Sequence, residues 1–219
     1  MATSLSIHSG VFMKRCVIVC GAKINDYDFV RGYLEDDFYI FCDGGLNHQE
    51  QLGVIPDLIV GDFDSHAKPN VDTETIVLPC EKDDTDSVFA VKEAIKRGYS
   101  DFLLIGVIGG RFDHSLGNIS ILLFLDSLGL NGKIIDDYSE MEIVGNVKKH
   151  IDGKCRYFSL LNIFGTAKGI TINNAKYPLL NGEISCEYQY GISNEVFPNK
   201  VAEVSVENGC LLLVKIMKE

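Results

Sequence analysis

Over roughly its first 140 residues, the chain alternates short apolar runs with longer polar or amphipathic stretches. Each run is nearly continuous in Val, Ile, Leu and Phe, and most are followed by Gly or Asp, as is typical of strands buried on both faces of a parallel sheet. The predicted strands are residues 15–20, 39–42, 58–60, 75–78, 101–108 and 133–137. This alternation predicts an α/β domain built on a parallel sheet.

Two helices are predicted between these strands, at residues 87–97 and 115–128. The first has a single apolar stripe that includes Val91 and Ala94, and Gly98 follows it as a stop signal. The second is apolar on most of its faces, which predicts a largely buried helix.

The pattern changes after Tyr138, where helical periodicity fades. Strand-like segments follow, separated by turns that contain Asn, Gly and Pro, at residues 155–163, 169–172, 202–206 and 211–217. These features predict an antiparallel β sandwich or roll. We therefore divide the chain into an α/β domain, residues 1–140, and a small β-sandwich domain, residues 141–219.

Composition and charge exclude several classes of protein. Apolar residues make up 46% of the chain, and 20 Lys and Arg against 31 Asp and Glu give a net charge of −11. This charge repels phosphate backbones, so we expect no nucleic-acid partner. No apolar run reaches the roughly 20 residues of a bilayer-spanning helix, and no stretch before residue 15 resembles a signal peptide. The seven cysteines include no Cys-x-x-Cys pair, which favours reduced thiols. We expect a cytoplasmic protein without a membrane partner.

Acidic or glycine-rich loops follow four of the predicted strands. Because the carboxyl ends of parallel strands meet at one edge of a sheet, these loops are expected to lie together. They are Asp43-Gly44-Gly45, Gly61-Asp62-Phe63-Asp64-Ser65, Lys82-Asp83-Asp84-Thr85-Asp86 and Gly109-Gly110-Arg111-Phe112-Asp113-His114.

Carboxylates crowded at one edge raise each other's pKa unless a divalent cation neutralises them. Mg²⁺ suits this need, and Asp62 and Asp64 can both turn toward one ion if the chain bends at Phe63. The glycines allow backbone amides to approach a ligand. Positive charge for a phosphate is supplied by Lys82, Arg111 and His114. The combination predicts magnesium-dependent phosphoryl-type transfer from a nucleotide.

Some of these residues also have a purely structural interpretation. Asp86 is well placed to cap the following helix, and Asp43-Gly44-Gly45 is a common turn sequence. We expect Asp137 to be a solvated surface residue, and His48 has no supporting context for a functional role.

In their order and spacing, the four motifs resemble the thiamine pyrophosphokinase family, also called the thiamin diphosphokinases. Weaker similarity continues in the β part at Tyr157-Phe158-Ser159-Leu160, residues 166–169, Tyr177-Pro178-Leu179 and Gly191-Ile192-Ser193-Asn194-Glu195. The resemblance implies an N-terminal α/β domain, a C-terminal β sandwich, and a homodimer with thiamine sites between subunits. It also implies the reaction, in which the hydroxyl of thiamine attacks the β-phosphorus of ATP and AMP leaves.

The resemblance further implies roles for individual residues. The magnesium ligands would be Asp43, Asp62, Asp64 and Asp86. The ATP contacts would be Asp43, Gly44, Gly45, Ser65, Lys82, Thr85, Arg111, His114 and Asn118. The catalytic set would be Asp64, Asp86, Arg111, Asp113 and His114, with Asp64 or Asp113 accepting the hydroxyl proton. Thiamine would contact Ser193 and Asn194 and, because the chain has no Trp, stack on Tyr188, Tyr190 or Phe197.

Three other functions stay open at this point. A haloacid-dehalogenase-like phosphatase would use Asp62 as its nucleophile, and a metal-dependent glycosyltransferase would use Asp62-Phe63-Asp64. A non-catalytic sensor would bind nucleotide or thiamine without turnover. P-loop and dinucleotide-binding glycine motifs are absent from the sequence, so those two enzyme classes are not indicated.

Overall fold

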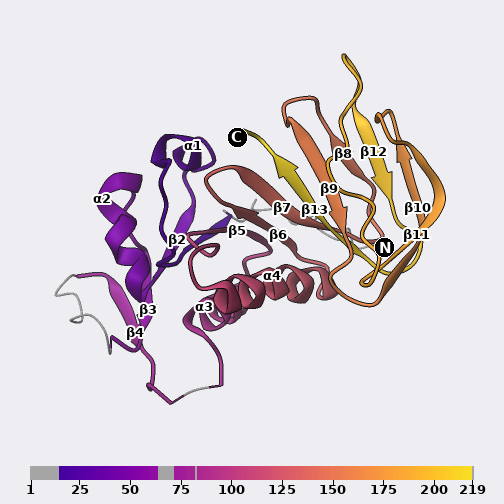
Figure 1. Cartoon of the computed structure of the whole chain (residues 1–219). Helices are drawn as coiled ribbons and strands as arrows, with labels where there is room; N and C mark the ends of the chain where they lie inside the picture. Colours follow the sequence, from indigo (N-terminus) through magenta and orange to yellow (C-terminus); the bar gives the residue numbers. More distant parts are fainter. Residues whose placement is uncertain (1–14, 64–71, 82, 219) are drawn as a thin grey trace, which may run out of the picture.

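The computed structural model describes residues 15–63, 72–81 and 83–218 (Figure 1). A nine-stranded sheet runs through both halves of the chain in the order β4-β3-β2-β1-β5-β6-β7-β13-β9. The first six strands are mutually parallel, and β7, β13 and β9 continue the sheet in antiparallel fashion. The parallel strands are β1 (Cys16–Val19), β2 (Phe38–Cys42), β3 (Leu58–Gly61), β4 (Glu74–Val77), β5 (Asp101–Ile105) and β6 (Asn131–Ile135).

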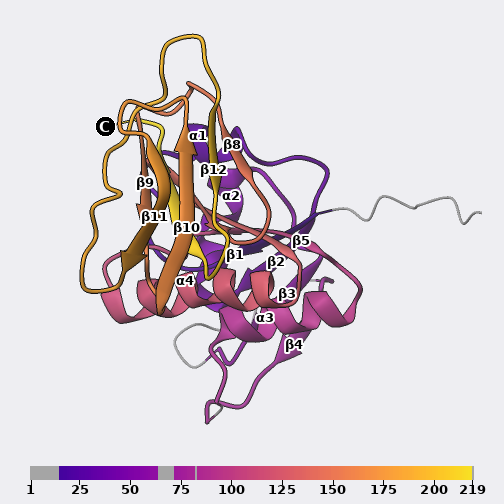
Figure 2. The same cartoon turned by 90° about the vertical axis from the view of Figure 1, so that its right-hand side faces the viewer.

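Helices cover both faces of the parallel half. The two long helices lie side by side below the sheet in Figure 2, and the short helices lie on the opposite face. The long pair is α3 (Asp86–Lys96) and α4 (Phe112–Ser127), and the short ones are α1 (Tyr27–Arg31), the 3₁₀ helix η1 (Asp43–His48) and α2 (Gln49–Leu52). Both faces of the strands are therefore buried, which explains their continuous apolar sequences.

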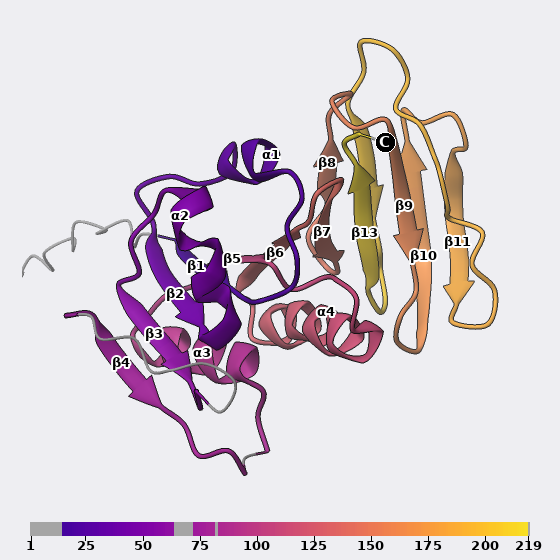
Figure 3. The same ribbon diagram turned by 60° about the vertical axis from the view of Figure 1, so that its left-hand side comes forward.

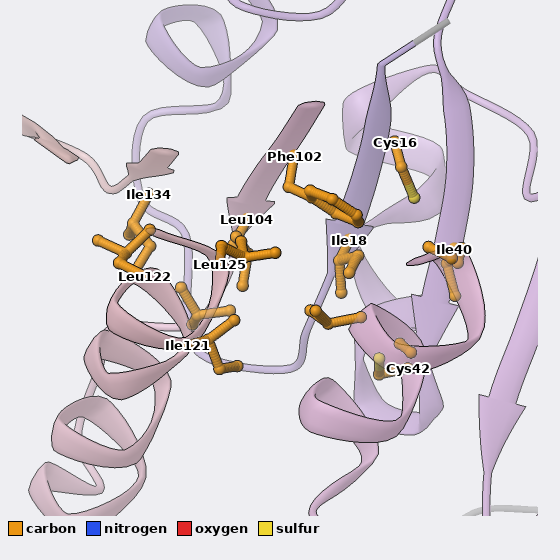
Figure 4. Close-up of a cluster of buried hydrophobic side chains, with 14 of the residues drawn as sticks. Cys16, Ile18, Ile40, Cys42, Phe102, Leu104, Ile121, Leu122, Leu125 and Ile134 are labelled. Atoms are coloured by element: carbon orange, nitrogen blue, oxygen red, sulfur yellow. The ribbon is translucent and has the colours of Figure 1, made fainter. Parts of the chain in front are cut away.

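Alternate strand residues form the two cores of this half. In β1, Cys16 and Ile18 pack toward α3 and α4, where Phe102 and Leu125 join them (Figure 4). Val17 and Val19 point the other way, toward the short helices. This alternation follows from the two-residue period of a strand.

The C-terminal half is a β sandwich. Its first layer is the antiparallel end of the large sheet, and its second is a separate sheet in the order β11-β10-β12-β8 (Figure 3). The strands are β7 (Ser139–Val144), β8 (Lys149–Ile151), β9 (Tyr157–Leu161), β10 (Thr166–Asn173), β11 (Leu179–Ser185), β12 (Ala202–Ser205) and β13 (Leu211–Ile216). Phe158 and Leu213 of the first layer and Ile170 and Val204 of the second share one buried cluster.

The predicted fold class is confirmed, but the large sheet is continuous where the chain was divided. Residues 140 and 141 both lie within β7, so the division into two domains stays a prediction. Analysis of the sequence missed β7 because its inner positions include Glu140 and Glu142. Lys215 of β13 pairs with both carboxylates, at 2.6 Å and 3.3 Å, so the strand is buried although its sequence reads as polar.

None of the helices in the described residues is both long and apolar enough to cross a membrane.

We predict that the sandwich core is a main source of stability. Phe158 is fully buried, so Phe158→Ala should lower the free energy of unfolding by about 3–5 kcal/mol. Phe164, 74% exposed, is the matched control, and Phe164→Ala should change it by less than about 0.5 kcal/mol. Urea unfolding of both variants measures the difference, and similar values for the two would contradict the packing described above.

Candidate functional site

A cavity of about 530 Å³ lies at the carboxyl ends of β1, β2 and β5 and at the N-termini of α3 and α4. Three of the four predicted strand-end loops contribute to its wall. The predicted residues that line it are Asp43, Gly44, Thr85, Asp86, Arg111, His114 and Asn118. The expectation that separate loops meet at one edge therefore agrees with the structure for these residues, while their individual roles stay predictions.

The acidic part of the wall comes from β2 and α3. Asp43 is the first residue of η1, directly after β2, and Asp86 is the first residue of α3. One carboxylate oxygen of each is shielded from solvent. Thr85, not Asp86, is the N-cap of α3, since its side chain accepts a hydrogen bond from the backbone N–H of Val88.

Asp62 emerges at the next strand end. Gly61 of β3 packs so close to Asp43 that a Cβ atom at position 61 would lie 3.0 Å from the Asp43 Cβ. The chain then turns at Phe63, whose φ is 54°, although Asp62 does not line the cavity. The other predicted residues of this region, Asp64, Ser65 and Lys82, lie outside the described residues.

The described part of the chain contains no group of three or more His, Cys, Asp or Glu side chains arranged to hold a metal ion. Asp43 and Asp86 nevertheless line one cavity, with an oxygen of each buried. Carboxylate oxygens are the donors that Mg²⁺ prefers, and one or two of them suffice when phosphates complete the coordination. The donors present are therefore chemically suited to a magnesium–phosphate complex.

The basic part of the wall comes from the start of α4. Arg111 and His114 line the cavity, but Asp113 does not. Arg111 forms a two-pronged pair with Asp113, with N–O distances of 2.5 Å and 3.2 Å. Hydrogen bonding to this guanidinium lowers the pKa of Asp113 to about 2. Asp113 is thus placed to orient Arg111.

A chain of hydrogen bonds ties α3 to α4 at the cavity floor. The Ser87 hydroxyl lies 3.0 Å from the Thr85 hydroxyl, and it donates a hydrogen bond to the side-chain oxygen Oδ1 of Asn118 at 2.8 Å. The Asn118 amide donates to the backbone carbonyl of Val107, also at 2.8 Å. The Ser115 hydroxyl of α4 accepts a hydrogen bond from the backbone N–H of Gly109, which joins α4 to the loop after β5. Asn118 therefore holds the walls together, whatever contact it makes with a ligand.

The glycines of the predicted loops have two different structural roles, lining the cavity and allowing close packing. Gly44 and Gly109 line the cavity, but Gly45 is buried beneath it. A Cβ atom at position 45 would lie 2.2 Å from the Val19 carbonyl oxygen, so the absence of a side chain lets η1 pack on β1. The predicted ligand contact by Gly45 has no support in this geometry.

Sequence analysis missed the loop that follows β1. Cys20, Gly21, Ala22 and Lys23 all line the cavity. The available signal was a glycine and a lysine directly after the first predicted strand. Cys42 also lines it, and a hydrogen bond with the Cys20 thiol, together with burial, raises the pKa of Cys42 above its usual range. The raised pKa favours the neutral thiol form of Cys42, and reduced thiols are what the sequence predicts.

The contacts of Asp137 correct the expectation of a solvated residue, and those of His48 show a structural role for it. His48 is buried, and its Nε2 lies 3.0 Å from the Ala22 carbonyl oxygen. Asp137 is also buried rather than solvated, and it accepts hydrogen bonds from the backbone N–H groups of Asn25 and Asp26 at 2.9 Å. Burial would raise the pKa of Asp137, but these hydrogen bonds lower it on balance. Both residues fix the segment that follows β1.

Ser193 and Asn194 lie in the sandwich, next to β9. Asn194 is buried, and its side chain bonds the backbone N–H and carbonyl of Tyr177 at 3.0 Å and 2.8 Å. Ser193 is exposed with a φ of 57°, and its backbone N–H donates to the Ser159 hydroxyl. Asn194 thus shapes the loop, while Ser193 is accessible on it.

Two family models match the chain. The model of the thiamin pyrophosphokinase catalytic domain matches residues 32–131, and that of the thiamin pyrophosphokinase vitamin B1 binding domain matches residues 146–211. Together they cover most of the sequence. The chain belongs to the thiamin pyrophosphokinase family. This membership makes it an enzyme of the transferase class.

Known members of the family match over nearly their full lengths. The thiamine pyrophosphokinase of Bacillus subtilis (strain 168) is 28% identical over 212 residues, which are 93% of this chain and 99% of that protein. A crystal structure of the Bacillus subtilis enzyme aligns with a TM-score of 0.82 at 25% identity, covering 94% of this chain and all of that one. The thiamin pyrophosphokinase of Geobacillus thermodenitrificans aligns with a TM-score of 0.78 at 26% identity, covering 94% and 98%.

These matches support none of the alternatives raised from the sequence. Neither the family models nor the relatives reported above include a haloacid-dehalogenase-like phosphatase. The glycosyltransferase and sensor readings find no relative among the matches reported above.

We predict that the contact between Gly45 and β1 maintains the cavity. In Gly45→Ala the new Cβ would overlap the Val19 carbonyl, so the free energy of unfolding should fall by about 1–3 kcal/mol. Gly117→Ala is the control, because position 117 lies within α4 and has open space around it. Since Ala favours helix over Gly, this substitution should raise the free energy of unfolding by up to about 1 kcal/mol. Thermal or urea unfolding measures both, and an unchanged Gly45→Ala protein would show that the contact is not tight.

Proposed function

We propose that this protein transfers the diphosphate group of ATP, as one unit, to the hydroxyl of thiamine, so that thiamine diphosphate and AMP are formed. Its family membership supports the reaction. The observation that supports the site most directly is the meeting of acidic strand ends and two helix N-termini in one cavity. Such a cavity has groups for both the cation and the anion of a magnesium–nucleotide complex.

The helix N-termini favour phosphate. The positive end of the helix dipole lies at the start of α3 and of α4, and unpaired amides there bind anions. In α4 the N-cap residue, Arg111, makes no side-chain capping bond. The Arg111 side chain therefore does not cap α4, and both Arg111, with its positive charge, and the His114 imidazole line the cavity beside this helix start.

We propose that Asp43 and Asp86, with Asp62 and Asp64, hold Mg²⁺ against the phosphates. When bound, the ion neutralises negative charge that develops on the transferred group. The support is the pair of carboxylates on one wall, each with a buried oxygen, since carboxylate oxygen is the donor that Mg²⁺ takes most readily.

The chain's own contribution is mainly to position the reactants. Phosphoryl-type transfer through a loose transition state depends on alignment and charge more than on a strong base. Thr85, Ser87 and Asn118 keep the two helix starts at a fixed separation, and Arg111 is oriented by Asp113. Since Asp113 is engaged in this pair, Asp64 is the better candidate to accept the hydroxyl proton.

We further propose a homodimer with thiamine bound between subunits. Asn194 pairs with Phe158 of β9, which is four strands from β5 in the sheet order. At about 4.8 Å per strand, the vitamin-binding loop and the cavity are roughly 19 Å apart along the sheet of one chain. A second chain would bring Ser193 and exposed aromatic residues such as Tyr188 beside the cavity.

The cytoplasm is the compartment that we propose for this reaction. All seven cysteines are free thiols, including the exposed Cys80 and Cys186. Free exposed thiols are typical of a reducing environment.

The proposed function is tested by incubating the protein with Mg²⁺, ATP and thiamine and quantifying the products by chromatography. We expect AMP and thiamine diphosphate in equal amounts. Asp86→Asn should lower kcat by about 100-fold or more, since it removes a charge from the metal site. Asp101→Asn, an exposed substitution at the amino end of β5, should leave kcat unchanged.

Other products would each contradict part of this account. ADP with free phosphate would show that the chain is an ATPase or phosphatase, and intact ATP would show that it only binds its ligands. Normal turnover in Asp86→Asn would contradict the metal assignment.

A further inference from the structure

We propose that Lys23 is a phosphate-binding residue of the cavity and that His48 is the positioning residue that fixes the loop bearing it. The inference rests on the proposed function, because it assumes that a nucleotide triphosphate occupies the cavity. It concerns the loop after β1, whose sequence, Cys20-Gly21-Ala22-Lys23, holds no acid and belongs to none of the four motifs.

Lys23 has the placement that an anion-binding side chain needs. It lines the cavity directly after β1, on the same wall as Gly21 and next to the loop that contains Gly109. It is exposed and makes no hydrogen bond or ion pair with another described residue. Arg111, by contrast, already shares its guanidinium with Asp113. A lysine ammonium is a compact charge on a flexible stem, which suits a phosphate oxygen whose position is set by other groups.

The residue before Lys23 is held on three sides. The Ala22 backbone N–H donates to the Gly106 carbonyl at 2.8 Å, and the Ala22 carbonyl accepts from His48 at 3.0 Å. The Ala22 side chain packs on Gly109, where an added Cβ would lie only 2.9 Å away. Because Ala22 is fixed at its amide, carbonyl and side chain, the backbone that leads into Lys23 has little freedom.

His48 can make its bond to Ala22 in only one neutral tautomer. A carbonyl accepts but does not donate, so Nε2 must hold the proton, and Nδ1 then accepts from the Tyr27 hydroxyl at 2.8 Å. Burial lowers the pKa of His48, which favours this neutral form. His48 is also the last residue of η1, whose first residue is Asp43. One short helix thus bears a metal-site carboxylate at one end and the support for the Lys23 loop at the other.

The role of Lys23 is tested by calorimetric titration of magnesium–ATP into the protein without thiamine. Lys23→Gln should raise the Kd for magnesium–ATP by about 10-fold or more, the effect of losing one charge-assisted hydrogen bond. Lys96→Gln is the matched control, because Lys96 is 79% exposed at the far end of α3 and should leave the Kd unchanged. An equal Kd for wild type and Lys23→Gln would overturn the assignment.

The role of His48 is tested by a double-mutant cycle on the same Kd. His48→Phe should raise the Kd for magnesium–ATP several-fold in the wild-type background but hardly at all in Lys23→Gln, since it acts through Lys23. Tyr27→Phe, which removes only the hydroxyl, should show the same dependence with a smaller effect and serves if His48→Phe does not fold. If His48 had a purely structural role, His48→Phe would lower Tm and leave the Kd unchanged, or it would raise the Kd equally in both backgrounds. Either result would overturn the proposal.

The same titrations distinguish failure of the proposed function from failure of this inference alone. If wild-type protein does not bind magnesium–ATP, the function and this inference both fall. If wild type binds and turns over ATP while Lys23→Gln binds equally well, the function stands and only this inference is overturned.

Discussion

The cavity depends on two places where neighbouring segments touch the end of β1 through backbone alone. If Gly45 had a Cβ atom, it would lie 2.2 Å from the carbonyl oxygen of Val19. A Cβ atom on Gly106 would likewise lie 2.2 Å from the carbonyl oxygen of Cys20. Gly106 also has a φ of 63°, which a side chain would strain. These contacts bring η1 and the loop after β5 against β1. Asp43 of η1 and the start of α4, which follows the loop after β5, therefore line the same cavity.

The parallel strands were predictable because burial on both faces gives each one an unbroken apolar sequence. The pattern of apolar positions on the two predicted helices located α3 and α4 to within three residues at their ends. The search for apolar runs failed for β7, where buried Glu140 and partly buried Glu142 pair with Lys215, because this pairing joins residues over 70 positions apart. The sequence analysis also missed β11, in which only one of seven positions, Ile184, is buried, so the strand lacks a continuous apolar sequence.

The candidate site could be predicted where residues with suitable side chains lie in loops that follow predicted strands. Asp43 directly follows β2, and Asp86 and Arg111 lie in the segments that follow β4 and β5, so the rule that parallel strands end at one edge brings them together. His48 and Asp137 were not recognisable, because their partners lie 26 and 112 positions away and only folding brings them into contact. Asp113 has the residue type expected of a base, but sequence does not reveal that its carboxylate is paired with Arg111.

The most direct test of the central claim is a crystal structure of the protein with Mg²⁺ and a non-hydrolysable ATP analogue. The account predicts the triphosphate between the N-termini of α3 and α4, with the metal bound by Asp43 and Asp86 and the loop after β1 against the phosphates. A nucleotide bound elsewhere, or a metal coordinated without either aspartate, would contradict it.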